Sequence, residues 1–141
     1  MKRKASAAWS GGLKDGKGAL TSDSGVLKDT QYSFSTRFED GIGTNPEELV
    51  AAAHAGCFSM ALSKILGLSD IVAESINTTA TVSLENVEGA FCITTIHLES
   101  TITASGADTV TVIECAQKAK AGCPISKALN AEITLDAKHV G

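Results

Sequence analysis

The feature that most constrains the fold is a strong helix start after a glycine-containing turn. Asn45 can cap a helix, Pro46 suits the first helical position, and Glu48 stands three residues after the cap. Gly67 is a natural end for this helix. The helix then contains about 21 residues and is roughly 32 Å long. We expect the rest of the chain to be arranged around it.

The middle of this helix is apolar or small on every side. Residues 49–62 show no polar face, which is the pattern of a helix that is buried all round. A chain of 141 residues forms one core by default, so we expect a single domain over residues 1–141. One helix so uniformly apolar needs a second subunit to cover it. The sequence therefore predicts an obligate homodimer.

The remaining segments predict an α+β fold, with a strongly curved antiparallel sheet wrapped around the long central helix. Turns break residues 5–36 into β hairpins. In residues 31–38 the aromatic residues and Thr36 alternate with polar residues, which is the pattern of a half-buried strand. Further patterns predict a long antiparallel hairpin from 72–84 and 90–103, a helix over 107–121, a short helix from Pro124, and a strand over 131–137.

Charge and hydropathy exclude some classes of partner. The net charge is −4, and the only basic cluster is Lys2, Arg3 and Lys4, so nucleic acid is not expected as a partner. The residues after Lys4 lack the apolar core of a signal peptide. No continuous apolar run reaches the roughly 18 residues that a membrane span needs. We predict a cytoplasmic protein without a membrane partner.

Four cysteines are present, and none of them forms a Cys-x-x-Cys pair. A structural zinc site is therefore not expected. In a reducing cytosol the cysteines need not form a disulfide scaffold, so we expect any cysteine with a function to be a reactive thiol. Cys57 is either an inert apolar residue of the helix or a peroxidatic thiolate. Cys123 lies between Gly122 and Pro124, where an exposed thiol would face free helix N–H groups, or it is merely structural. Cys92 and Cys115 are predicted core residues.

Two motifs in this order resemble those of the OsmC/Ohr family of hydroperoxide reductases, over nearly the whole chain. The first is Thr36-Arg37-Phe38-Glu39, then Gly43-Thr44-Asn45-Pro46-Glu47-Glu48-Leu49 and Ala53-His54-Ala55-Gly56-Cys57-Phe58-Ser59-Met60. The second is Ala121-Gly122-Cys123-Pro124-Ile125-Ser126. The position of Arg37 within Thr36-Arg37-Phe38-Glu39 resembles that of the arginine in the osmotically inducible branch of the family.

The resemblance implies a cysteine-based peroxidase that serves oxidative or osmotic stress defence. Organic hydroperoxides are the implied substrates, and hydrogen peroxide is a second candidate. Cys57 corresponds to the peroxidatic cysteine, which becomes a sulfenic acid, and Cys123 resolves it as a disulfide. Arg37 and Glu47 match the family's site residues: the guanidinium would hold the thiolate, and the carboxylate would orient it. An external dithiol, such as a lipoyl protein in relatives, resets the enzyme.

Helix geometry adds a constraint on this site. Glu47 and Cys57 are ten residues apart, which is about 15 Å along one helix. They cannot share a site within one subunit, so we predict a site built from both chains of an isologous dimer. His54 invites a role as a base or a metal ligand, but no second ligand of suitable spacing follows, so no metal or cofactor is expected.

A different class of function remains open. Arg37 on a polar strand face would be solvated by default, and Glu47 in a first helical turn favours the helix dipole without any catalysis. In that case the chain is a small-molecule or lipid-binding module with structural cysteines. Five apolar residues are candidates for lining a pocket for an alkyl chain in either case: Phe38, Phe58, Met60, Leu62 and Phe91.

Overall fold

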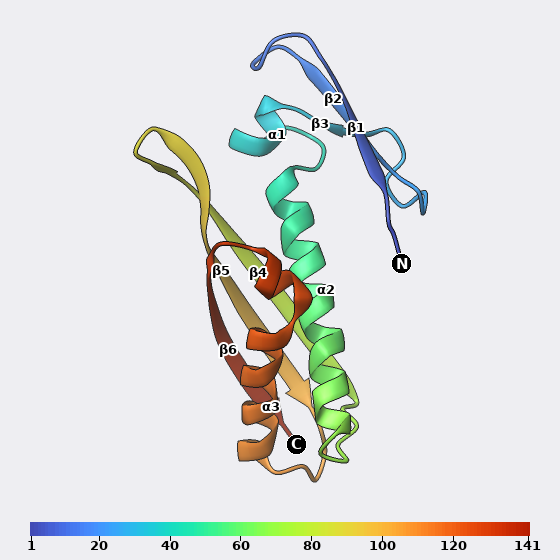
Figure 1. The fold of residues 1–141 in the computed structure, drawn as a ribbon, viewed down its shortest axis with the longest axis vertical. Helices are drawn as coiled ribbons and strands as arrows, with labels where there is room; N and C mark the ends of the chain where they lie inside the picture. The colour runs from blue at the N-terminus through green and yellow to red at the C-terminus, as the bar shows by residue number, and fades with distance from the viewer. The chain divides into compact units, whose positions relative to one another are not determined.

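The computed structural model describes residues 1–141 as an α+β protein with two compact units, Met1–Leu49 and Val50–Gly141. Each unit contains one three-stranded sheet. Figure 1 shows the course of the chain from the first sheet through the long helix to the second sheet. The α+β class predicted from the sequence is confirmed.

The first unit is built on the antiparallel sheet β1 (Ala5–Ser10), β2 (Lys17–Ser22) and β3 (Thr30–Tyr32). The prediction of a strand over residues 31–38 is wrong beyond Tyr32, because α1 (Phe34–Phe38) begins there. Ser33 caps this helix: its hydroxyl accepts the Thr36 N–H at 3.4 Å, and its own N–H donates to the Thr36 hydroxyl at 2.8 Å.

The long helix α2 (Pro46–Gly67) begins and ends as predicted. The Asn45 side-chain oxygen accepts the Glu48 N–H at 2.8 Å, which satisfies one of the free donors of the first turn. By length and composition alone α2 is able to cross a membrane, contrary to the expectation of no such run. The buried core helix of a water-soluble protein passes the same test.

Burial of α2 is confined to one stripe within a single chain. The fully buried members are spaced four residues apart and are His54, Phe58, Leu62 and Leu66. Met60 lies on another face and is 78% exposed. The prediction of a helix buried all round is therefore wrong for one chain, and its covering by a second subunit stays a prediction.

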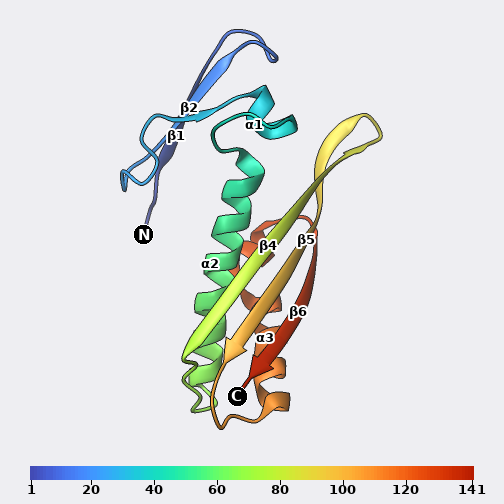
Figure 2. The same ribbon diagram turned by 180° about the vertical axis from the view of Figure 1, so that it is seen from behind.

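The second unit contains the sheet β4 (Ser75–Val87), β5 (Ala90–Thr103) and β6 (Glu132–Val140). The predicted antiparallel hairpin of β4 and β5 is confirmed, but β6 pairs parallel to β5, so the sheet is not antiparallel throughout. A parallel pair needs a crossover connection, and α3 (Thr109–Gly122) with α4 (Pro124–Ala128) supplies it. Figure 2 shows α2 and α3 behind one face of this sheet.

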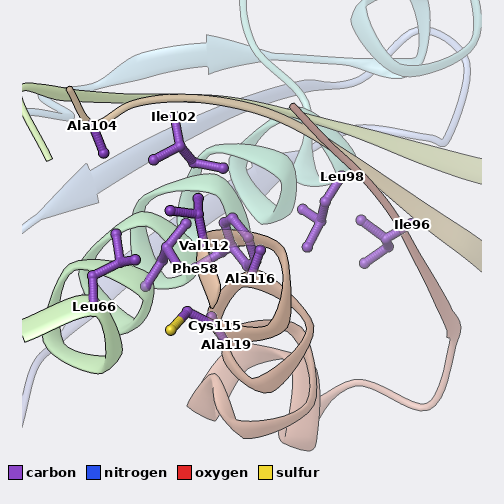
Figure 3. Packing of buried hydrophobic residues seen from close by; sticks show 11 residues of the cluster. Phe58, Leu66, Ile96, Leu98, Ile102, Ala104, Val112, Cys115, Ala116 and Ala119 are labelled. Carbon is purple, nitrogen blue, oxygen red and sulfur yellow. The ribbon is translucent and has the colours of Figure 1, made fainter. Parts of the chain in front are cut away.

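The hydrophobic core of the second unit lies between this sheet and the two helices, as Figure 3 shows. Helix α2 contributes its apolar stripe, β5 contributes alternate residues, and α3 contributes small side chains: Phe58, Leu66, Ile96, Leu98, Ile102, Val112, Ala116 and Ala119. Cys115 is 2% exposed, as predicted. Cys92 is exposed instead, because it lies near the free end of the β4–β5 hairpin, where the neighbouring residues are exposed as well.

Candidate active site

Two reduced thiols meet in the second unit. Cys57 lies midway along α2, and Cys123 lies at the corner where α3 ends and α4 begins. With φ −58° and ψ 128°, Cys123 has left the helical conformation, which turns the chain between the two helices. The two side chains hydrogen-bond to each other. The fold thus brings together the two cysteines that the sequence motifs singled out.

Cys57 is half-buried and is the less acidic thiol of the pair. Burial raises its pKa because a thiolate loses hydration, and the hydrogen bond and charge of Cys123 raise the pKa further. The backbone N–H of Ile125 acts in the opposite direction. Within one protomer, these contacts favour the thiol form of Cys57.

Cys123 has no solvent exposure, contrary to the prediction of an exposed thiol. Its burial by itself raises the pKa, but hydrogen bonds outweigh that effect and lower the pKa overall. The donors are the Cys57 thiol, the backbone N–H groups of Ser126 and Ile125, and the Ser126 hydroxyl. Groups at the start of α4 thus lower the pKa of Cys123, while the surrounding elements exclude solvent from it.

Ser126 is a site residue that the sequence analysis missed. Its hydroxyl lies 2.7 Å from Nε2 of His54, which has no solvent exposure. Burial lowers the pKa of His54, so the ring is neutral. The signal was weak: Ser126 follows Cys123 by three residues, and nothing in the sequence relates it to a histidine 72 residues earlier. No group of three or more His, Cys, Asp or Glu side chains is placed to hold a metal ion.

Arg37 and Glu47 form an ion pair within the first unit. The guanidinium donates from Nη2 to Oε1 at 2.7 Å and from Nε to Oε1 at 3.0 Å and Oε2 at 3.2 Å. The Arg37 side chain is 38% exposed and that of Glu47 is 13% exposed. The predicted pairing of the two residues is present, and a forked contact of this kind fixes the plane of the guanidinium. Its free edge stays available to a further acceptor.

Each unit also has an apolar hollow beside its candidate residues. A groove of about 650 Å³ runs past Cys57 and is lined by residues that include Met60, Lys64, Leu68 and Pro124. In the first unit, a hollow of about 180 Å³ beside Arg37 is lined by Trp9, Leu13, Tyr32, Ser33, Phe34, Phe38 and Pro46. Met60 and Phe38 thus line hollows, whereas Phe58 and Leu62 belong to the core.

Both the sequence and the structure of the chain are similar to those of known proteins. The OsmC-like protein family matches residues 39–138. The peroxiredoxin OsmC of Escherichia coli is 54% identical over 134 residues, which cover 95% of this chain and 94% of that protein. The crystal structure of the organic hydroperoxide resistance protein OhrB of Bacillus subtilis has a TM-score of 0.71 at 30% identity and covers 96% of this chain and 98% of that one. The chain therefore belongs to the OsmC-like family.

Proposed function

We propose that the chain is a thiol-dependent peroxidase that reduces organic hydroperoxides in stress defence, with Cys57 as the nucleophile and Cys123 as the resolving thiol. The observation that carries this proposal is the hydrogen-bonded thiol pair, one member of which opens onto an apolar groove. Relatives named peroxiredoxin and organic hydroperoxide resistance protein support hydroperoxides as the substrate class.

The accessibility of the two thiols supports these roles. Cys57 lines the groove, whereas Cys123 has no exposed surface, so a peroxide meets Cys57 first. The Cys57 thiolate attacks the terminal peroxide oxygen, the O–O bond breaks, and an alcohol leaves after it gains a proton. Cys123 then attacks the sulfenic sulfur, which forms the disulfide and releases water. A dithiol reductant restores both thiols by exchange.

The activation of Cys57 supports a site that is shared between two chains. Its pKa is raised within one protomer, so a thiolate at neutral pH requires a cation from elsewhere. Arg37 is held by Glu47, and Glu47 precedes Cys57 on α2 by about 15 Å. We propose that the Arg37–Glu47 pair of one protomer serves the Cys57 of its partner in a homodimer.

The first sheet also favours a dimer. Every residue of β1 is exposed, and Trp9 on this strand is 40% exposed. A small sheet whose edge strand is exposed throughout is marginally stable alone, and a second subunit would supply a further layer. The reductant in this proposal is a dithiol of the lipoyl type, and the compartment is the cytoplasm, where that reductant keeps both thiols reduced.

Thiol titration tests the reaction. After one equivalent of an organic hydroperoxide, the wild type is expected to lose two free thiols per chain, and Cys57→Ser is expected to lose none. Cys92→Ser serves as the matched control, since Cys92 is an exposed cysteine outside the pair, and it should lose two thiols like the wild type. An unchanged thiol count in the wild type would defeat the enzyme and favour the binding-module alternative.

Mixed dimers test the shared site. Co-expression of Arg37→Ala chains with Cys57→Ser chains creates heterodimers in which one site unites an intact Arg37 with an intact Cys57 from different chains. If the site is shared, the mixture regains about a quarter of the wild-type activity, because half of the dimers are mixed and each has one intact site. If the site lies within one chain, the mixture stays as inactive as its parents.

A further inference from the structure

A chain of polar side chains leads from the interior of the second unit to the buried thiol. His54 on α2 and Ser126 on α4 approach to 2.7 Å between Nε2 and Oγ. The same Ser126 hydroxyl, in the first turn of the helix that Cys123 precedes, acts on the Cys123 thiol as a hydrogen-bond donor and lowers its pKa. Cys57 and Ser126 are the side chains that act directly on Cys123, and His54 reaches it through Ser126.

The direction of these hydrogen bonds follows from the other ring nitrogen. Nδ1 of His54 is buried and has no hydrogen-bond partner. A neutral ring carries one proton, and a buried N–H without an acceptor is costly, so the proton belongs on Nε2. Nε2–H then donates to Ser126 Oγ. The Ser126 hydroxyl is thereby left to donate its own proton to the sulfur of Cys123.

From this arrangement we infer that His54 and Ser126 are positioning residues for Cys123, which orient a hydroxyl donor toward its thiolate and hold α4 against α2 for the resolution step. The inference rests on the proposed function and deepens it. Peroxide attack takes place at Cys57, and this pair acts on the second sulfur. The titratable groups that face Cys123 are Cys57 directly and His54 through Ser126, both from α2.

The resolution step shows why such a donor matters. The Cys123 thiolate gives an electron pair to the Cys57 sulfenic sulfur, so the S–S bond forms as the S–O bond breaks. Hydroxide leaves with the S–O electron pair and takes one proton to become water. No further oxidant is needed. A donor that favours the thiolate raises the fraction of Cys123 that is ready to attack near neutral pH.

Step-resolved kinetics test the inference. A single turnover with one equivalent of organic hydroperoxide is followed by rapid mixing, with a cyclic dione to trap the Cys57 sulfenic acid and thiol counting to follow the disulfide. Ser126→Ala and His54→Phe are expected to slow resolution about 10-fold at pH 7, the usual effect of losing a hydrogen bond to a charged group. Trapped sulfenic acid should increase accordingly, while the peroxide step is not slowed.

The pH profile separates orientation of a donor from simple packing. In Ser126→Ala the resolution rate should recover at alkaline pH, where Cys123 ionises without help, so its midpoint moves upward by about one pH unit. Ser126→Thr keeps the hydroxyl, and His54→Gln keeps a donor near the Nε2 position, so both should resolve within about threefold of the wild type. Ser59→Ala removes another partly buried hydroxyl, which is bonded to Ala55 and Thr78, and should change neither step.

Two results would overturn the inference. One is resolution at the wild-type rate in Ser126→Ala, and the other is a slow rate that persists at every pH, which would mean that the residues only hold the sulfurs in place. A failure of the proposed function looks different, because then the wild type itself forms neither sulfenic acid nor disulfide.

Discussion

In the proposed function, the two units contribute different parts of the active site. The first unit contains the Arg37–Glu47 pair, a fixed positive charge whose partner is already in place. The second contains the Cys57–Cys123 pair, in which the accessible sulfur is the one whose pKa is raised. The first unit offers a cation without a thiol nucleophile, and in the second no cation lowers the pKa of the accessible thiol. For the proposed peroxidase, neither set of contacts is therefore sufficient by itself.

The two units also differ in the size of the side chains that they bury. Every large side chain that is fully buried belongs to the second unit, where α2, α3 and the second sheet enclose a core. In the first unit the buried residues are small, namely Gly16, Gly18, Thr36 and Thr44. The second unit therefore supplies most of the hydrophobic stabilisation of one chain. The small number of buried side chains in the first unit supports the proposed dimer, in which a second subunit would cover it.

The largest expected effect comes from removing the cation. Arg37→Ala should slow the reaction of Cys57 with an organic hydroperoxide by about 10² to 10³-fold, since a preorganised donor to a developing charge is lost. Arg37→Lys keeps the positive charge but loses the forked guanidinium, so its reaction rate should lie between those of the wild type and Arg37→Ala. Stopped-flow measurement of thiolate consumption checks this. Arg3→Ala, an exposed arginine of the same unit, is the control, and full activity of Arg37→Ala would break the comparison between the units.

A matched pair of core truncations sharpens the difference in packing. Leu62→Ala removes a side chain with no exposure from the second unit and should lower the free energy of unfolding by about 2 to 5 kcal/mol. Leu20→Ala removes a partly buried side chain from β2 and should cost clearly less. Urea denaturation monitored by circular dichroism measures both. Equal losses would mean that the first unit has a core as strong as that of the second.

A smaller effect is expected at the connection between α1 and α2. The Asn45 side chain caps α2 through Glu48 and also donates to the Thr36 carbonyl at 3.0 Å. Asn45→Ala should lower the free energy of unfolding by about 1 kcal/mol. Asn45→Asp keeps the cap but loses the donor to Thr36. This variant should therefore retain most of the free energy of unfolding that Asn45→Ala loses, as measured by chemical denaturation. No recovery would show that the contact with α1, rather than the cap, provides the stability.

Local signals were the part of the fold that the sequence predicted well. The caps of α2 and the stop at Gly67 were found because each depends on neighbouring residues only. The strand predicted over residues 31–38 failed since Phe34 and Phe38 fit a helix as well as a strand, and the Ser33–Thr36 box decides between them. The parallel pairing of β6 is a property of the crossover, which no local pattern encodes.

The site shows the same division between local and distant information. Motifs around Cys57 and Cys123 singled out the two sulfurs that the fold brings together, and the position of Cys123 at the start of α4 agrees with its lowered pKa. The burial of Cys123 and the contact of His54 with Ser126 depend on how α2 and α4 pack, so spacing along the chain could not reveal them. The same holds for Cys92, whose exposure depends on how far the β4–β5 hairpin extends.

The smallest effect concerns the stability of the second unit at mildly acidic pH. Burial holds the pKa of His54 below its ordinary value of 6.5, so the unfolded chain binds a proton more readily than the folded one. The stabilisation that this histidine provides is complete above pH 6.5 and declines as the pH falls through the lower folded value. Urea midpoints at pH 7.5 and 5.5 should therefore differ more in the wild type than in His54→Gln, which cannot titrate. The pKa of Asp108 is lowered below its ordinary value of 3.8, so this carboxylate does not change its charge between pH 5.5 and 7.5 and does not affect the comparison. Equal pH dependence in both proteins would mean that His54 is free to ionise in the folded state, and the neutral ring required beside Ser126 would be lost with it.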